Sequence, residues 1–263
     1  SYKAYKGAAE MKINGWDISG AQARQWNVTP AFSNIENESE WQRGSPLPFF
    51  VNSSIGFKTI QITFLVYGAN RNEILQNCST LLSKMMSESV ILELDKFDHK
   101  FCGYMVKHDF AENPLGKLRV TSNRLSKITV DFSCYEYAEK PDGSPYSQSA
   151  SGMLEIAITN PGNIWTPCIV EITPRAAGAS AFTVKGINRN PDTGESLPVT
   201  IRNTTKDKTV ILDGETGKIT EAGVNKSADV DIWSLPVLMP GTNRITLDNT
   251  WMDITVKYRP RFM

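Results

Sequence analysis

The stretch Leu212–Thr220, LDGETGKIT, has the residue types of a phosphate-binding loop. Such a loop needs the spacing G-x-x-x-x-G-K-[ST] between a strand and a helix, because its backbone N–H groups surround the phosphates while the lysine and the hydroxyl reach the terminal phosphate and Mg²⁺. Here Gly214 and Gly217 are three residues apart, and Ile219 follows Lys218. β-prone runs lie on both sides of the glycines. The segment therefore predicts a hairpin turn rather than a nucleotide site.

Two other segments have residue types that could bind a metal ion. Asp95, Asp98 and His99 are close in sequence, but they lie between two strand-like runs, where charged residues are expected at a hairpin tip. Residues 190–195 resemble a calcium loop, but they lack the five-residue run to the bidentate glutamate of an EF-hand. We therefore predict no metal site.

The sequence offers no complete set of catalytic residues. No G-x-S-x-G elbow is present, and the second half of the chain contains no histidine, so a Ser-His-Asp set is not expected there. Paired carboxylates stay an open alternative without a fold. We predict that the chain is not an enzyme and that it has no catalytic, cofactor-binding or metal-binding residues.

The four cysteines do not have the spacing of a metal site. They are Cys78, Cys102, Cys134 and Cys168, with no C-x-x-C pair and no histidine at zinc spacing. Cys134 and Cys168 lie in apolar stripes of strand type. We predict buried, reduced thiols and folding in a reducing compartment.

The charge of the chain is balanced. Its 263 residues include 28 basic and 28 acidic side chains, so the excess of positive charge that grips a phosphate backbone is missing. The sequence contains no run of 18 apolar residues, which a membrane-spanning helix would need. Its first residues lack the apolar core of a secretory signal. We expect a partner other than a nucleic acid or a membrane.

The first half of the chain predicts strands and one helix. Residues 57–68 alternate with a period of two, and residues 70–88 change to a helical period, beginning with the cap residues Asn70 and Glu73. Residues 127–137 alternate again, and residues around 95–99 connect two further strands. The predicted apolar stripe of the helix consists of Ile74, Leu75, Cys78, Leu81, Leu82, Met85 and Met86.

The second half predicts only strands and turns. Residues 138–152 are rich in Pro, Gly and Ser, and we predict the linker between the domains at 141–152. After it, turn signals recur about every ten residues between short β-prone runs, which is typical of a β-sandwich or jelly roll. Overall the sequence predicts a mainly β protein of two domains.

Residues 20–52 fit neither pattern. This segment is long and polar in its middle, and it holds Trp26, Trp41, Phe49 and Phe50. A stretch of that length with little regular structure is usually functional or stabilised from outside. We therefore take these four aromatic residues as candidate subunit-interface residues; packing onto their own sheet is the alternative.

In the order and spacing of many segments, the chain resembles the distal tail proteins (Dit) of tailed phages with long flexible tails and of related tailocins. The likeness covers essentially the whole chain, and no single motif is diagnostic. The segments that carry it are KINGWDIS (12–19), NEILQNCSTLLSKMMSE (72–88), ITVDFSCYEY (128–137), NPGNIWTPCIVEITP (160–174), VTIRNTTKDKTVILDGETGKIT (199–220), DIWSLPVLMPGTNRITL (231–247) and DITVKYRPRF (253–262).

The resemblance implies a specific architecture. Residues 1–140 would form a tail-tube-like β-sandwich flanked by one α-helix, residues 141–152 a linker, and residues 153–263 a galectin-like β-sandwich (jelly roll). The segment at about 20–52 would be the belt that packs on neighbouring subunits.

The resemblance also implies a function. Six copies would form a ring in the virion tail tip, assembled in the host cytoplasm, that joins the tail tube protein to the tail-tip hub protein. The tape-measure protein and then DNA would pass through its lumen, and a receptor-binding protein is a further candidate partner. The host, the receptor and the residues that line the lumen stay open.

Two other functions stay as alternatives. A carbohydrate-binding adhesion module would act through the second domain, although that domain lacks the histidine of sugar-binding galectins, and we expect Trp165, Trp233 and Trp251 to pack in its core. A major tail tube protein is the other alternative, and the additional β-domain argues against it.

Overall fold

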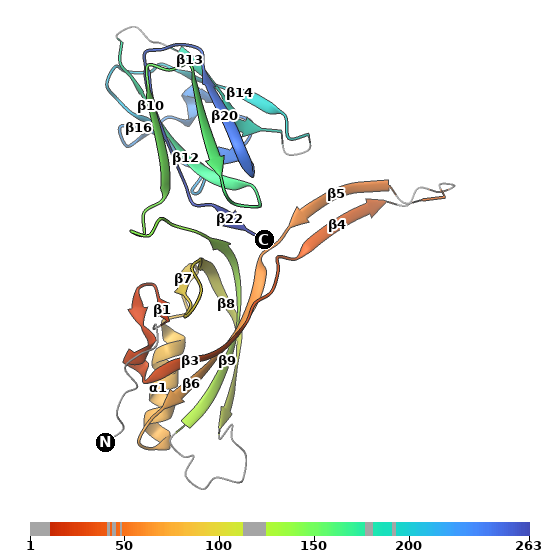
Figure 1. Ribbon diagram of the computed structural model, residues 1–263, viewed down its shortest axis with the longest axis vertical. Coiled ribbons are helices and arrows are strands. Elements are labelled where there is room, and N and C mark those ends of the chain that lie inside the picture. The colour runs from red at the N-terminus through yellow and green to blue at the C-terminus, as the bar shows by residue number, and fades with distance from the viewer. Residues whose placement is uncertain are drawn as a thin grey trace. The chain divides into compact units, whose positions relative to one another are not determined.

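The structure is a computed structural model that describes residues 11–40, 43, 46–47, 49–112, 125–176, 181–190 and 193–263. Contacts divide the chain into two compact units, Ser1–Tyr137 with Met263, and Ala138–Phe262 (Figure 1). Both units consist mainly of antiparallel strands, and the described part of the chain contains one α-helix, which confirms the predicted fold class.

Unit 1 is built on a curved antiparallel sheet with the strand order β2-β1-β7-β8-β9-β6-β3. From Ile60 to Val66 on β6 and from Ile128 to Cys134 on β9, every second residue is fully buried on one face, as the alternation predicts. The expected hairpin around 95–99 joins β7 to β8. The elements are β1 (Lys12–Ile13), β2 (Trp16–Asp17), the short 3₁₀ helix η1 (Ile18–Ala21), β3 (Ala23–Thr29), β6 (Lys58–Tyr67), β7 (Val90–Glu93), β8 (Lys100–Glu112) and β9 (Leu125–Tyr137).

The helix α1 (Arg71–Ser83) packs on the apolar face of this sheet (Figure 1). The Asn70 side chain accepts a hydrogen bond from the backbone N–H of Glu73, which is the predicted cap, while the Glu73 carboxylate accepts one from the N–H of Ala69. The predicted stripe is too wide, because Leu75 is 42% exposed and Met86, beyond the helix end, is 75% exposed.

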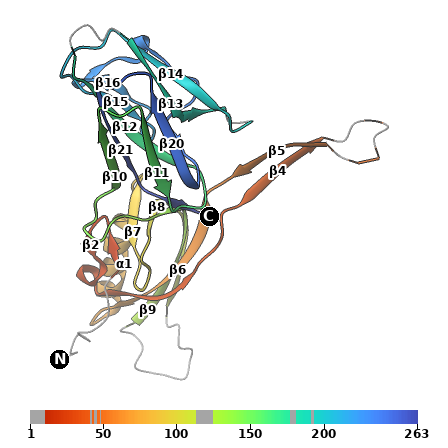
Figure 2. The same ribbon diagram turned by 45° about the horizontal axis from the view of Figure 1, so that its top comes forward.

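Most of residues 20–52 are regular, so the prediction of little regular structure there was wrong. Residues 23–29 form β3, and β4 (Ile35–Glu40) pairs with β5 (Phe49–Ile55) in a two-stranded ribbon, here called the arm. The arm projects away from the sheet of unit 1 (Figures 1 and 2). Its polar side chains gave no clear alternation because neither face of the ribbon is buried within the described chain.

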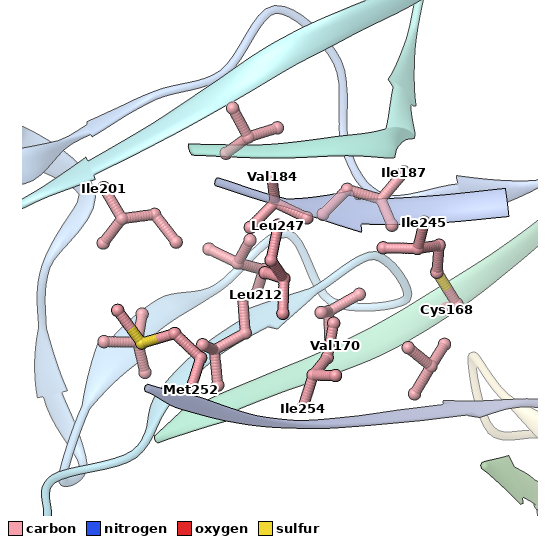
Figure 3. Close-up of a cluster of buried hydrophobic side chains, with 14 of the residues drawn as sticks. Cys168, Val170, Val184, Ile187, Ile201, Leu212, Ile245, Leu247, Met252 and Ile254 are labelled. Carbon is pink, nitrogen blue, oxygen red and sulfur yellow. The ribbon is translucent and has the colours of Figure 1, made fainter. Parts of the chain in front are cut away.

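Unit 2 consists of two antiparallel sheets with a shared apolar core. Figure 3 shows side chains from both sheets meeting in this core, among them Val170, Leu212 and Ile254 from one sheet and Val184 and Ile245 from the other. The first sheet contains β10 (Tyr146–Ser151), β21 (Met252–Tyr258), β12 (Thr166–Pro174), β15 (Val210–Asp213), β16 (Ile219–Glu221) and β17 (Val224–Asn225), and β19 (Val237–Leu238) pairs with β12. The second contains β11 (Glu155–Asn160), β20 (Gly241–Leu247), β13 (Ala181–Arg189), β14 (Ser196–Arg202) and β18 (Val230–Asp231), which the short 3₁₀ helix η2 (Ser227–Asp229) precedes. The last strand, β22 (Arg261–Phe262), belongs to neither of these two sheets.

The expected linker 141–152 is partly a strand. Its residues Tyr146–Ser151 form β10 at the edge of the first sheet, paired along their whole length with β21. Ser149 and Thr255 are joined by a hydrogen bond of 2.8 Å between their hydroxyls, and the ring of Tyr146 stacks on that of Tyr258. The polar composition of these residues did not indicate a strand. An edge strand is held by backbone hydrogen bonds to its neighbour and needs no apolar stripe.

Candidate subunit interface

The LDGETGKIT segment is the predicted hairpin turn between β15 and β16. The Asp213 carboxylate accepts hydrogen bonds from the N–H groups of Glu215 and Thr216 and from the Thr216 hydroxyl, which fixes the turn. Gly217 has a φ of 74°, the left-handed region that favours glycine. A Cβ at Gly214 would lie 2.2 Å from the carbonyl oxygen of Pro236. Both glycines are required by the backbone of the turn.

The residues with possible metal chemistry do not form a cluster. His99 pairs with Glu136 through Nδ1, and the Asp95 backbone N–H donates to the side chain of Gln25. Asp192 lies outside the described residues. Among the residues that the structure describes, no three acidic, histidine or cysteine side chains are grouped as a metal site would need.

The four cysteines are free and buried, as predicted. Burial raises the pKa of the Cys78 thiol to about 11 and that of Cys134 to about 12, and it raises the pKa of the Cys168 thiol further. A thiol becomes a nucleophile only as the thiolate, so these side chains are inert components of the two cores.

Of the four candidate interface residues, Trp26 is the one whose side chain the structure describes. It lies on β3 at a bulge, where the register against β6 shifts between Gln25 and Asn27, and its side chain is 60% exposed. The guanidinium of Arg24 lies 5.6 Å from the indole centroid. An exposed tryptophan at an edge strand is a residue type that is enriched at protein interfaces.

The other three candidates are located only in part. Phe49 and Phe50 are the first residues of β5, so both lie on the arm, but their side chains are outside what the structure describes. Trp41 is itself outside the described residues. Their role as interface residues remains a prediction.

The arm carries apolar residues that sequence reasoning did not select. Ile35 and Ile55 face each other across the ribbon and are 49% and 48% exposed, and Phe32 is 85% exposed in the approach to β4. Within the described chain, β4 and β5 pair only with each other. An isolated two-stranded hairpin is marginally stable in water, so the arm has the properties of an element that another molecule completes.

The face of the sheet opposite α1 is polar and uncovered by any described helix. Asp131 on β9 accepts a hydrogen bond of 2.9 Å from Gln61 on β6 and forms an ion pair of 3.3 Å with Lys107 on β8. The Gln61 hydrogen bond is the main cause that lowers the pKa of Asp131. Thr63 and Thr129 lie opposite each other on the same face. The exposed Lys107 makes part of this face polar, whereas Thr63 and Leu65 on the same face are only 7% and 9% exposed.

Aromatic side chains occupy one end of that polar face. Phe57, next to the arm, is 53% exposed and lies with its centroid 6.3 Å from the rings of both Tyr104 and Tyr135. Tyr104 is 45% exposed. Unit 1 thus has an exposed aromatic group where its sheet meets the arm.

The expectation for the tryptophans of unit 2 was wrong. Trp165, Trp233 and Trp251 are 38%, 75% and 40% exposed, and the core is filled by aliphatic side chains instead. Trp233 is followed by Ser234, whose N–H and hydroxyl both donate to the buried Asn188 side chain. These hydrogen bonds hold the loop in place while the Trp233 indole is exposed to solvent.

No helix in the described chain is long and apolar enough to cross a membrane.

Comparison with known proteins gives two informative matches. Residues 161–262 match the family model described as siphovirus-type tail component, C-terminal domain. The whole chain has the fold of the SPP1 Dit (gp 19.1) protein, described as a paradigm of the hub adsorption apparatus in phages that infect Gram-positive bacteria. That match has a TM-score of 0.71 and 11% sequence identity, and it covers 97% of this chain and 99% of the other.

A further structural match is weaker. Chains from the phage P2 baseplate in its activated conformation align with TM-scores of 0.49 with Ca and 0.47 with Sr, at 12% and 13% identity, over 95% and 96% of this chain and 97% and 98% of theirs. No curated protein sequence matches the chain. Residues 161–262 thus match a family of siphovirus-type tail components, and the chain shares the fold of SPP1 Dit.

Proposed function

We propose that this chain is a structural, non-enzymatic component of a phage or phage-like tail tip, where six copies form a ring that joins the tail tube to the tail-tip hub. The observation that carries the proposal is the agreement of the complete two-unit fold with SPP1 Dit over 97% of the chain. The tail-component family match over residues 161–262 supports it independently of the first unit.

The polar face of β3, β6, β9 and β8 is proposed to line the lumen of the ring. A passage for the tape-measure protein and then DNA has to be wet, and it must not hold a polyanion tightly. The Lys107–Asp131 ion pair and the hydrogen bond from Gln61 to Asp131 supply polar groups on this face, and the charge of Lys107 is paired there. DNA is therefore a passing molecule in this proposal and not a bound ligand.

The proposed neighbours are the tail tube protein on one side of the ring and the hub protein on the other. A receptor-binding protein is a further candidate partner, and unit 2, with the proposed galectin-like fold, would present the surface for it. The particle would assemble in the host cytoplasm and remain in the virion. The arm and the exposed Trp26 on β3 form the proposed contact between adjacent copies.

The oligomeric state tests this proposal directly. Light scattering of the purified protein should give a mass of about six subunits, and negative-stain images should contain single rings. The variant Trp26→Ala should shift the mass toward smaller species, while Trp251→Ala, a change of the same kind in unit 2, should leave it unchanged. A chain that stays monomeric at high concentration would contradict the ring.

The same images separate the ring from a major tail tube protein. A tube protein would stack into long tubes, whereas the proposal expects rings that do not extend. Long tubes from the purified chain alone would favour the tube alternative.

The exposed Trp233 favours carbohydrate binding through unit 2 as the second candidate function. An indole that is 75% exposed on an anchored loop can stack on a sugar ring. A glycan array with the native protein and with Trp233→Ala tests it. Specific binding that the substitution abolishes would support the adhesion module. An array that shows no specific binding would argue against carbohydrate binding through unit 2.

A further inference from the structure

An apolar strip runs along one side of unit 1, from the sheet onto the arm. The β3–β6 and β4–β5 ladders keep one register, because Thr29 faces Gln61, and six residues further along each strand Ile35 faces Ile55. The backbone N–H of Gly56 donates to the Asn34 carbonyl between the two ladders, which continues the same register. Phe57, between β5 and β6, contacts Tyr104 and Tyr135 on the polar face of the sheet, and the continued register places Ile55 on the same side.

We define the apolar strip as Ile35, Ile55, Phe57 and Tyr104. All four side chains are about half exposed, at 49%, 48%, 53% and 45%. The arm is two-sided, because Glu38 and Glu40 alternate with these positions and lie on its opposite face. The acidic face can stay in water, so the side with the isoleucine pair is the one that can be buried without burying a charge.

A second exposed apolar surface lies on the helix of the same unit. Leu75, Ser79 and Leu82 have the spacing i, i+4 and i+7, which places them on one side of α1, next to the stripe that faces the core. Leu75 is 42% exposed, Leu82 is half-buried, and Met86 beyond the helix is 75% exposed. We call these four residues the helix flank. It contains no charged side chain.

A closed ring needs two different, complementary surfaces on every copy, since each subunit contacts its two neighbours through opposite sides. The apolar strip and the helix flank are two such surfaces, both depleted of charge as the centre of an interface should be.

We infer that the apolar strip of one copy packs on the helix flank of the next copy around the ring. The partner that completes the arm is thus a second copy of this chain, and its contact is the outer side of α1. This inference rests on the ring proposed above and adds which two surfaces meet.

Disulfide trapping tests the contact. The double variant Ile55→Cys, Leu75→Cys should form disulfides between copies under mild oxidation, because the two positions come from opposite surfaces. The native thiols are buried and stay out of the reaction. A matched control replaces Leu75→Cys by Gln76→Cys, about 100° further around the same helix, and should cross-link at least about tenfold more slowly. Both helix positions are exposed, so folding should be unaffected.

The pattern of products decides between geometries. A head-to-tail contact gives a ladder of covalent species up to the size of the ring, while a two-fold contact would stop at the dimer and overturn the inference. Rings that assemble normally but do not cross-link would also overturn it and leave the proposed function standing. A monomer without cross-links would contradict both. Independently, Ile55→Asp should weaken self-association at least about tenfold.

Discussion

At the residue scale, one buried ion pair sits at the foot of the arm. Lys58, the first residue of β6, is 3% exposed, and its Nζ lies 2.5 Å from the Glu136 carboxylate, which His99 also contacts. Burial by itself raises the pKa of Glu136, but the hydrogen bonds and charges of Lys58 and His99 outweigh it and lower that pKa below its ordinary value. The Glu136 carboxylate therefore stays ionised and pairs with the buried Lys58 ammonium group.

We predict that Glu136→Gln lowers the free energy of unfolding by about 3 kcal/mol, because it leaves the buried Lys58 charge without compensation. Glu93→Gln, which removes an exposed ion pair of 3.6 Å with Lys100, should cost less than about 1 kcal/mol. Urea unfolding at neutral pH measures both. Equal effects of the two substitutions would contradict the importance of the buried pair.

The same group predicts a dependence on pH. A carboxylate whose pKa is lowered by folding stabilises the protein above its unfolded pKa, near 4.5, and that contribution is lost as the pH falls through the folded pKa. The difference in unfolding free energy between the native protein and Glu136→Gln should therefore shrink as the pH falls below about pH 5. A difference that grows in this acidic range would contradict this sign.

The buried thiols give a second prediction at this scale. Because burial raises the pKa of Cys134 to about 12 and that of Cys168 further, both should remain unmodified by a thiol-specific alkylating reagent at pH 8 while the chain is folded. Mass spectrometry after labelling measures this, and labelling in denaturant, where all four thiols should react, is the control. Rapid labelling of either residue in the folded protein would show that its core opens.

At the scale of elements, the turn between β15 and β16 requires a residue without a side chain at Gly214. We predict that Gly214→Ala lowers the unfolding free energy of unit 2 by at least about 1–3 kcal/mol, because the new Cβ would overlap the Pro236 and Cys168 carbonyl oxygens. Gly56→Ala is the control, since its Cβ would have no neighbour closer than 3.6 Å. Urea midpoints at constant slope measure the change; equal midpoints would contradict the crowding.

At the scale of the whole molecule, the two units have separate cores. We predict that a fragment of residues 138–263 folds by itself, because both faces of its core are supplied from within unit 2. Circular dichroism should give a strand spectrum with a cooperative thermal transition. An unfolded fragment would mean that unit 2 needs the first unit for its stability.

Much of this architecture could be predicted from local patterns. The period-two alternation of β6 and β9 located their buried faces, and the change to a helical period with the Asn70 cap located α1. The turn residues of Asp213–Gly217 identified the hairpin in place of a phosphate loop. These features depend on residues near one another in the chain, so their physical causes are visible in the sequence.

Other features were decided only by tertiary structure. β10 forms because it pairs with β21 through backbone hydrogen bonds. The arm is a ribbon because β4 and β5 continue the register in which β3 pairs with β6. Trp233 is exposed because aliphatic side chains from the two sheets of unit 2 already fill the core. The pattern of alternating residues and the positions of the turns follow from the amino-acid sequence alone, because they reflect local preferences of the backbone. Which side chains are left uncovered, and so can form an interface, depends on partners far apart in the chain, and only folding brings these together.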